Sequence, residues 1–316
     1  MIRTFRSATA DATTLVHDPR TGLTHRADRP LAPARLQLDD TAVATWPVVP
    51  AHEIVRSQPL SLCWSPIVRC NLECPYCLDD KTVAEASGQS RRRIATILAG
   101  SGVLGVDISG GEPLLLRDLP ALADILTDGG LVVSVTTNGW HLTRRVNDVA
   151  GHVDAVRVSL DGPSAKIHDG NRRSPGSFDR AVDGIRAAIA AGIPCQVQTV
   201  LMASTAAHAQ DMVDLADDLG ASGLTFLQHL PIGDAAGNCS GEAISDDMAR
   251  ALIARLCVPT GLTIRLRERT SAGGFTVVRA DGKVYRNADD AEHIAALRPL
   301  TTPADLDLRS TPDGSA

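Results

Sequence analysis

Between residues 60 and 257, six short apolar runs alternate with longer amphipathic segments, and this alternation restricts the fold more than any other feature. The short runs predict strands, and the segments between them carry apolar residues at helical spacing. The expected strands cover 60–64, 105–109, 131–137, 154–160, 195–201 and 223–229, and the expected helices cover 81–100, 117–128, 142–150, 178–191, 206–219 and 245–257. Strands that are each followed by a helix build a parallel sheet. We therefore predict an α/β fold, a partial (β/α)6 TIM-like barrel, over residues 59–258.

The segments on either side of this alternation have a different character. Residues 1–58 hold turn-forming residues around short strands, which predicts a small N-terminal extension. Residues 259–300 contain extended stretches and a hairpin around Asp281 and Gly282, which predicts a short β-rich C-terminal segment. The charge run at 265–269 within it is expected to be a solvated face. Residues 301–316 are polar and proline-rich, so we expect a disordered tail.

Composition is that of a soluble globular protein. Hydrophobic residues make up 44% of the 316 residues and charged residues 22%. The net charge of -6 leaves no basic surplus to neutralise nucleic-acid phosphates. No apolar stretch has the length of a membrane span, and the first residues lack the apolar run of a signal peptide. We expect a cytoplasmic protein that binds neither nucleic acid nor membranes.

Three of the seven cysteines, Cys70, Cys74 and Cys77, stand within eight positions in the sequence RCNLECPYC. Soft thiolate ligands select zinc, copper(I) or an iron-sulfur cluster. Structural zinc normally needs a fourth ligand at a paired spacing, and no second CxxC or HxxxH lies nearby. Three cysteines around a [4Fe-4S] cluster leave one iron open to a substrate or cofactor. The spacing therefore favours a cluster that takes part in chemistry.

The cysteine segment resembles the CxxxCxxC motif of radical S-adenosylmethionine (SAM) enzymes, including the Asn-Leu after Cys70 and the aromatic Tyr76 before the last cysteine. Residues 110–113 read GGEP and resemble the family segment that receives the SAM amino group. A glycine pair lets the chain approach a ligand closely, and Glu112 can accept hydrogen bonds from an ammonium group. The resemblance implies one [4Fe-4S] cluster on the three cysteines and SAM as the second cofactor.

Later segments resemble the family as well. Thr136 in TTNG and Ser159 in SLDG are similar to family positions that place hydroxyl groups near SAM. The stretches HDGNRR and GSFDR resemble a subgroup that modifies peptides, in which an arginine pairs with the SAM carboxylate. Arg180 is the preferred candidate, with Arg172 and Arg173 as rivals. These segments follow the carboxyl ends of predicted strands, where barrel active sites are built.

The implied site has three groups of residues. The cluster ligands are Cys70, Cys74 and Cys77, and the implied SAM-binding residues are Tyr76, Gly110, Gly111, Glu112, Thr136, Ser159 and Arg180. The substrate-side candidates are Asp107, Gln198, His229 and Cys239. The latter are polar or reactive residues on or just after predicted strands, where they either line the cavity or make structural contacts.

The resemblance implies reductive cleavage of SAM to a 5′-deoxyadenosyl radical that abstracts hydrogen, with the electron supplied by an external flavodoxin- or ferredoxin-type donor. We expect the substrate to be a peptide or an amino-acid-derived natural product precursor, as in the maturation of ribosomal peptides. The alternatives are a sugar, nucleoside or antibiotic intermediate and, from a different class, a non-catalytic metal-binding scaffold. The C-terminal hairpin resembles the start of a SPASM-type auxiliary-cluster extension but lacks its cysteine near Arg286. Both oxidation and a redox-neutral outcome, as in an epimerase, lyase or mutase, therefore stay open.

Overall fold

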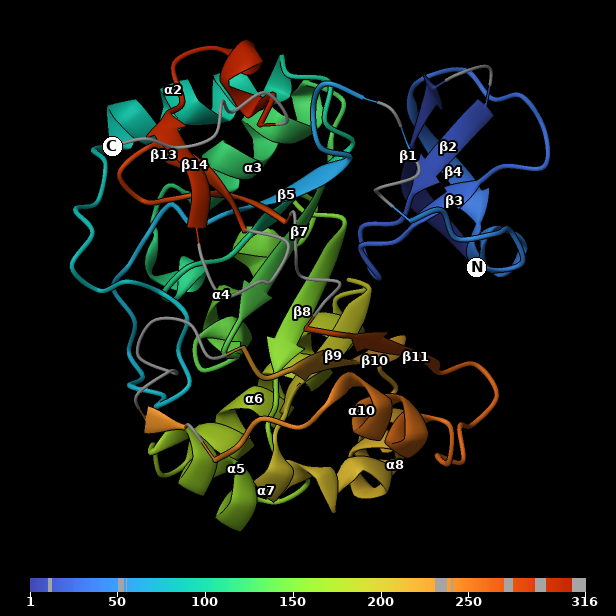
Figure 1. Cartoon of the computed structure of the whole chain (residues 1–316), viewed down its shortest axis with the longest axis vertical. Coiled ribbons are helices and arrows are strands. Elements are labelled where there is room, and N and C mark those ends of the chain that lie inside the picture. Colours follow the sequence, from blue (N-terminus) through green and yellow to red (C-terminus); the bar gives the residue numbers. More distant parts are fainter. Residues whose placement is uncertain are drawn as a thin grey trace.

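The computed structural model describes residues 1–10, 13–50, 54, 56–230, 238–239, 241–269, 275–287 and 294–308. Two sheets organise this part of the chain: a four-stranded sheet near the N-terminus and a ten-stranded sheet that forms the main body (Figure 1). None of the helices in these ranges has the length and apolar content needed to cross a membrane.

The main sheet confirms the predicted partial barrel. Its strand order is β11-β10-β9-β8-β7-β6-β5-β12-β13-β14. The six predicted strands correspond to β5 (Ser61–Trp64), β6 (Gly105–Ile108), β7 (Val132–Thr137), β8 (Ala155–Ser159), β9 (Cys195–Leu201) and β10 (Gly223–Gln228), all parallel to their neighbours. Successive side chains on a strand point to opposite faces. Apolar residues such as Val106 and Val158 therefore enter the core, while alternate residues such as Asp107 and Arg157 face the interior of the barrel.

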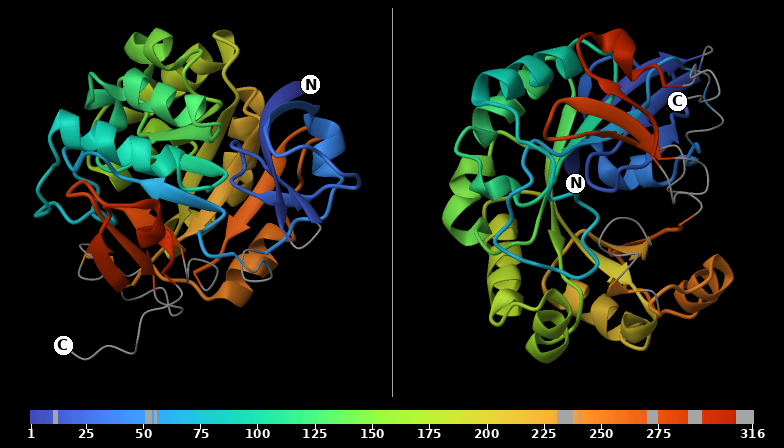
Figure 2. Two further views of the ribbon diagram at one scale, coloured as in Figure 1. Left: turned by 90° about the horizontal axis from the view of Figure 1, so that it is seen from above. Right: turned by 60° about the vertical axis from the view of Figure 1, so that its left-hand side comes forward.

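Helices cover the outer face of the curved sheet (Figure 2). They are α2 (Gly88–Ala99), α3 (Leu119–Asp128), α4 (Leu142–Val149), α5 (Ala165–Arg172), α6 (Ser177–Ala190), α7 (Ala203–Ala206), α8 (Ala209–Asp218) and α10 (Asp246–Ile253). The prediction of a helix over 81–100 is wrong in its first part. The helix begins at Gly88 because the Ser87 hydroxyl caps it, accepting a hydrogen bond from the Ser90 amide (3.2 Å).

Strand β11 (Thr263–Arg267) corrects the boundary predicted at residue 258, because it pairs in parallel with β10 as a seventh barrel strand. On the other side of β5, β12 (Thr276–Val278) is also parallel, and β13 (Lys283–Asn287) and β14 (Ile294–Pro299) continue the sheet antiparallel. The C-terminal segment is thus part of the barrel sheet.

The predicted disordered tail is ordered in its first half. A short 3-10 helix spans Pro303–Leu306, and Leu306 and Leu308 are only 1% and 5% exposed. Both pack in the main core, and burying a leucine stabilises the fold by about 1.5–3 kcal/mol. Residues 309–316 lie outside the described residues.

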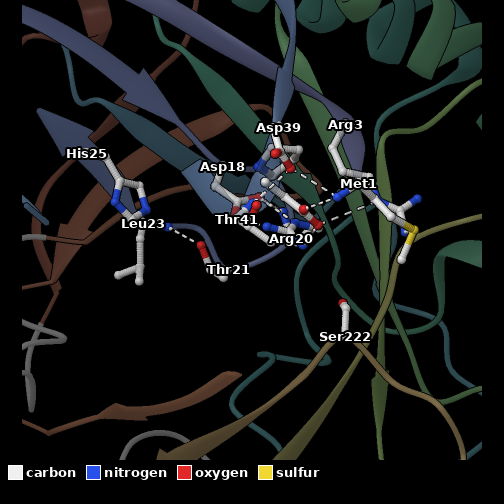
Figure 3. A network of polar contacts seen from close by, with 12 residues as sticks. Met1, Arg3, Asp18, Arg20, Thr21, Leu23, His25, Asp39, Thr41 and Ser222 are labelled. Carbon is white, nitrogen blue, oxygen red and sulfur yellow. Dashed lines mark hydrogen bonds and ion pairs between the residues drawn. The ribbon is translucent and has the colours of Figure 1, made fainter. Parts of the chain in front are cut away.

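The N-terminal extension folds into a sheet of order β3-β2-β1-β4. Its elements are β1 (Ile2–Ala10), β2 (Thr13–His17), β3 (Thr24–Arg26), β4 (Arg35–Asp39) and the short helix α1 (Asp40–Ala44). Phe5, Val16 and Trp46 belong to a small core of its own. The loop between β2 and β3 is held by Arg20, which pairs with Asp18 (3.0 Å) and Asp40 (3.1 Å) (Figure 3).

This loop packs against the barrel interior. Arg157 on β8 donates hydrogen bonds to the carbonyl oxygens of Pro19 (2.5 Å) and Arg20 (3.0 Å), and Arg265 on β11 donates to the carbonyl oxygen of Thr21. The His17 ring lies against Gly105, the first residue of β6. The extension therefore closes the amino-terminal end of the barrel, while the cysteine segment follows the carboxyl end of β5.

The junction at His17 predicts a pH-dependent stability. Burial lowers the pKa of His17 from 6.5 to about 3, so the folded protein keeps this ring neutral while the unfolded chain binds a proton below pH 6.5. The free energy of unfolding should therefore fall as the pH drops below 6.5, by up to about 1.4 kcal/mol per pH unit until the pH nears 3. Urea unfolding between pH 7 and pH 4.5 should show a shallower dependence for His17→Gln than for the wild type. Equal slopes would contradict this assignment.

Candidate functional site

A cavity of about 1150 Å³ occupies the interior of the barrel. Its lining includes Cys63, Asp107, Ser134, Thr136, Arg157, Ser159, Gln198, Thr225, His229, Arg265 and Arg267. Pockets for one small molecule usually measure roughly 300–1,000 Å³, so this cavity has room for a cofactor and a substrate side by side.

The three motif cysteines lie in the loop after β5. Cys70 is exposed, Cys74 and Cys77 are half-buried, and all three are free thiols. Burial, with smaller contributions from Glu112 and the neighbouring thiols, raises the pKa of Cys70 to about 11, while the Leu72 amide donates to its Sγ atom (3.4 Å) and opposes the shift. Burial also raises the pKa of Cys77. A thiol whose pKa is raised needs a nearby cation to become a thiolate, and a metal centre provides such a cation.

The donor set fits a cluster better than a single zinc ion. Across the described ranges, no three His, Cys, Asp or Glu side chains converge on a position for one metal ion. Thiolates around a [4Fe-4S] cluster each bind a different iron, so they need not meet at one point. A structural zinc site would need four converging ligands.

The glycine pair after β6 packs against the cysteine segment. A Cβ atom on Gly110, whose φ is 105°, would lie 2.4 Å from the carbonyl oxygen of Ile67. One on Gly111 would lie 2.3 Å from the carbonyl oxygen of Arg69. The Gly111 amide donates to the Ile67 carbonyl (2.8 Å). The sequence predicted that the glycine pair lets the chain approach a ligand closely. In the structure, the two glycines also lie close to the backbone that leads into Cys70.

Glu112 ties the ends of β6 and β7 to this loop. It is fully buried, and its carboxylate accepts hydrogen bonds from the Leu114 amide (2.9 Å), the Thr137 hydroxyl (2.7 Å) and the Asn138 amide (2.8 Å). Burial raises its pKa although these donors oppose the shift. The Asn138 side chain in turn lies 3.7 Å from the Sγ atom of Cys70. Three protein donors engage its oxygens, so Glu112 holds the ends of β6 and β7 together, and its predicted contact with the SAM amino group stays a prediction.

A second polar cluster joins the cysteine loop to the end of β8. The Tyr76 hydroxyl donates to Asp161 (2.7 Å), and Arg172 of α5 pairs with the same carboxylate (2.6 Å). Arg172 also lies 3.6 Å from the Sγ atom of Cys74 and 5.8 Å from the centre of the Tyr76 ring. Burial alone would raise the pKa of Asp161, but Arg172, His168 and Tyr76 together hold it below its ordinary value. Asp161 is therefore a charged anchor of the loop.

The structure distinguishes among the three candidate arginines. Arg172 is 8% exposed and contacts a cysteine sulfur. Arg180 is exposed on α6, where its guanidinium lies over the Trp140 ring (5.4 Å). Arg173 is exposed at the end of α5. The preference for Arg180 does not agree with this geometry, because the turn between α5 and α6 carries Arg180 onto the outer helix.

Other predicted residues are spread around the cavity. Thr136 donates to Asp107 (2.8 Å), which also pairs with Arg157 (2.7 Å). Ser159, Gln198 and His229 line the cavity. Cys239 is buried in an apolar cluster with Tyr76 and Met202. The chemical role of each of these residues remains a prediction.

The sequence interpretation did not single out Asn138 or Asp161 within TTNG and SLDG, and it took the charge run at 265–269 for a solvated face. Arg265 and Arg267 instead line the cavity. The alternation of Thr263, Arg265 and Arg267 with Ile264 and Leu266 is the pattern that predicts this.

Residues 64–216 match the model of the Radical SAM superfamily. The AdoMet-dependent heme synthase of Methanosarcina barkeri is 29% identical over 235 residues, covering 72% of this chain and 67% of that protein. The PqqA peptide cyclase of Methylocella silvestris is 35% identical over 159 residues, covering 48% of this chain and 43% of that protein. The chain thus spans between 43% and 67% of the length of these two relatives.

Among solved structures, SuiB from Streptococcus suis bound to the precursor peptide SuiA matches with a TM-score of 0.57 at 17% identity. The match covers 81% of this chain and 62% of SuiB. At this identity the likeness concerns the fold alone, and it agrees with the partial barrel.

Proposed function

This chain belongs to the radical SAM superfamily, and from that premise we propose that it is a radical SAM enzyme whose [4Fe-4S] cluster is held by Cys70, Cys74 and Cys77. The observation that carries the proposal is the packing of the GGEP turn against the cysteine segment, where a Cβ on Gly111 would lie 2.3 Å from backbone carbonyl oxygens. Ile67, Val68 and Tyr76 of the same segment line the cavity, which has room for SAM and a substrate.

When bound, the cluster and SAM supply the one-electron chemistry that yields a 5′-deoxyadenosyl radical, with an external flavodoxin- or ferredoxin-type protein as the electron donor. The chain's own residues hold and orient the reactants. We assign the backbone of Gly110 and Gly111 and the hydroxyls of Thr136 and Ser159 to SAM. Tyr76, held by Asp161, would shape the adjoining wall, and the barrel would exclude water from the reaction.

For the substrate we propose a peptide or an amino-acid-derived precursor. The likeness to the PqqA peptide cyclase supports this, as does the volume of about 1150 Å³. The relative named as a heme synthase favours the second candidate, a non-peptide small molecule. Incubating the enzyme and SAM with short peptides encoded next to its gene, and separately with nucleosides and sugars, distinguishes the two. Modification of a small molecule alone would refute the peptide assignment.

The enzyme class is tested by anaerobic reconstitution with iron and sulfide. We expect about four irons per chain and formation of 5′-deoxyadenosine from SAM with a strong reductant. Cys74→Ala should lose both, whereas Cys257→Ala, which removes an exposed cysteine outside the motif, should keep both. Stoichiometric zinc without SAM cleavage would show that the cysteines are structural and would favour the scaffold alternative.

A further inference from the structure

Strand β11 places two arginines inside the barrel. Its register sets Arg265 beside Thr225 and Arg267 beside Leu227 of β10. All four residues line the cavity. Because alternate residues of a strand share one face, both guanidinium groups belong to the interior surface.

Neither arginine forms an ion pair within the described residues. Arg265 donates to a single carbonyl oxygen, that of Thr21. Arg267 lies over the Phe275 ring, 4.2 Å from its centre. The third arginine of the cavity differs, because Arg157 pairs with Asp107 (2.7 Å).

Two other carboxylates of the cavity wall, those of Asp80 and Glu268, are engaged by other partners. The Asp80 carboxylate accepts hydrogen bonds from Thr82, and Glu268 pairs with Arg250. Within the part of the chain that the structure describes, Arg265 and Arg267 therefore have no carboxylate at ion-pairing distance.

Burial destabilises the charged form of both guanidinium groups. Burial, with smaller contributions from Arg267 and Arg157, lowers the pKa of Arg265 to about 9, while Asp18 opposes the shift. Burial also lowers the pKa of Arg267. A buried cation without a partner is costly, so an anion that enters the cavity would recover part of that cost.

His229 provides an independent observation on the same wall. It follows β10, two residues after Leu227, and is only 2% exposed. Among the residues that the structure describes, neither ring nitrogen has a hydrogen-bond partner, although buried polar groups are normally satisfied. The ring lines the cavity, where it can bond to a ligand.

We propose that Arg265, Arg267 and His229 form a subsite for an anionic group of the substrate. On a peptide this group is a carboxylate, from an Asp or Glu side chain or from the C-terminus, and this identification rests on the proposed function. The two guanidinium groups would bind its oxygens, and His229 would donate a hydrogen bond beside them. The subsite explains why the barrel carries two arginines that no carboxylate of the described residues pairs.

The test measures binding without turnover, by ligand-observed NMR on cluster-loaded protein with saturating SAM. The first probe is N-acetyl-glutamate-N-methylamide, and its matched neutral control is N-acetyl-glutamine-N-methylamide. N-acetyl-alanine distinguishes a C-terminal carboxylate from a side-chain one, and inorganic phosphate tests for a different anion. We expect one of the carboxylates to bind at least tenfold more tightly than the neutral control.

Arg267→Gln should weaken carboxylate binding at least tenfold, and Arg267→Lys should weaken it less because it keeps the charge. Arg186→Gln, on α6 with a side chain that is 65% exposed, should bind as the wild type does. Because Arg267 has no ion pair to lose, Arg267→Gln should leave the thermal unfolding midpoint of the ligand-free protein unchanged or raised. A purely structural arginine would show the opposite pattern, a lowered midpoint with unchanged binding.

Absence of carboxylate binding by the wild type, or binding that Arg267→Gln does not weaken, would overturn the subsite. Binding of phosphate alone would overturn its assignment to a carboxylate. These failures are separate from a failure of the proposed function, since 5′-deoxyadenosine formation from SAM with a strong reductant does not depend on Arg267. If SAM is cleaved but no carboxylate binds, only the subsite is wrong.

Discussion

Replacing Gly111 with alanine is expected to abolish cluster loading, reducing the iron content from about four to fewer than about one per chain. The added Cβ would lie 2.3 Å from the carbonyl oxygens of Val68 and Arg69, and backbone atoms cannot rotate away as a side chain can. The clash must be relieved by moving the segment directly before Cys70. Overpacking of this kind costs about 1–3 kcal/mol, which a protein of this size survives while the local loop is displaced.

The measurement is iron and sulfide analysis after anaerobic reconstitution, with circular dichroism to show that the fold is retained. Gly170→Ala is the matched control, because a Cβ at that position meets nothing within 4 Å. Gly170→Ala should load iron normally. A Gly111→Ala protein with full iron content would show that the contact is not required to hold the cysteine loop.

Arg172→Gln is expected to lower the free energy of unfolding by about 3–5 kcal/mol, because it leaves Asp161 buried without its charged partner. The two side chains lie 2.6 Å apart, and Asp161 has no exposed surface. The same substitution removes the guanidinium 3.6 Å from the Cys74 sulfur. Since positive charge and hydrogen bonds at cluster sulfurs favour the reduced state, the midpoint potential of the reconstituted protein should become more negative.

Urea unfolding and EPR-monitored potentiometry measure the two effects separately. Adding Asp161→Asn should recover part of the lost stability, because the unpaired charge is then gone, but it should not restore the potential. Arg173→Gln is the control, since this neighbouring arginine is exposed. If Arg172→Gln matched Arg173→Gln in both measurements, the anchor assigned to Asp161 and Arg172 would be wrong.

The six strands that are each followed by a helix could be predicted because each is a short apolar run bounded by turns. They are six of the eight parallel strands of the main sheet. β11 was expected as an extended stretch of the C-terminal segment but not as a barrel strand, because its alternate residues are arginines, which read as a solvated surface when no partner strand is known. The first half of the tail was missed for a related reason. Leu306 and Leu308 are two apolar residues in a polar context, and only their packing against the core shows that they are ordered.

In the candidate site too, the sequence predicts some features and leaves others to the tertiary structure. The cysteine spacing and the glycine pair are local patterns, so the sequence alone indicated the family and the cluster motif. The sequence alone did not distinguish Arg172 from Arg180, because both follow the same strand and differ only in which helix presents them.

By itself, therefore, the sequence determined the barrel class, the cysteine motif and the radical SAM resemblance, since each depends on residues that are close together in the chain. Tertiary structure alone decided which arginine reaches Cys74, what Glu112 holds and that β11 pairs with β10 in the barrel. These depend on contacts between residues separated by tens to hundreds of positions, such as Arg172 with Cys74 and Arg265 with Thr21. Burial converts such contacts into large electrostatic effects, and burial is a property of the folded chain.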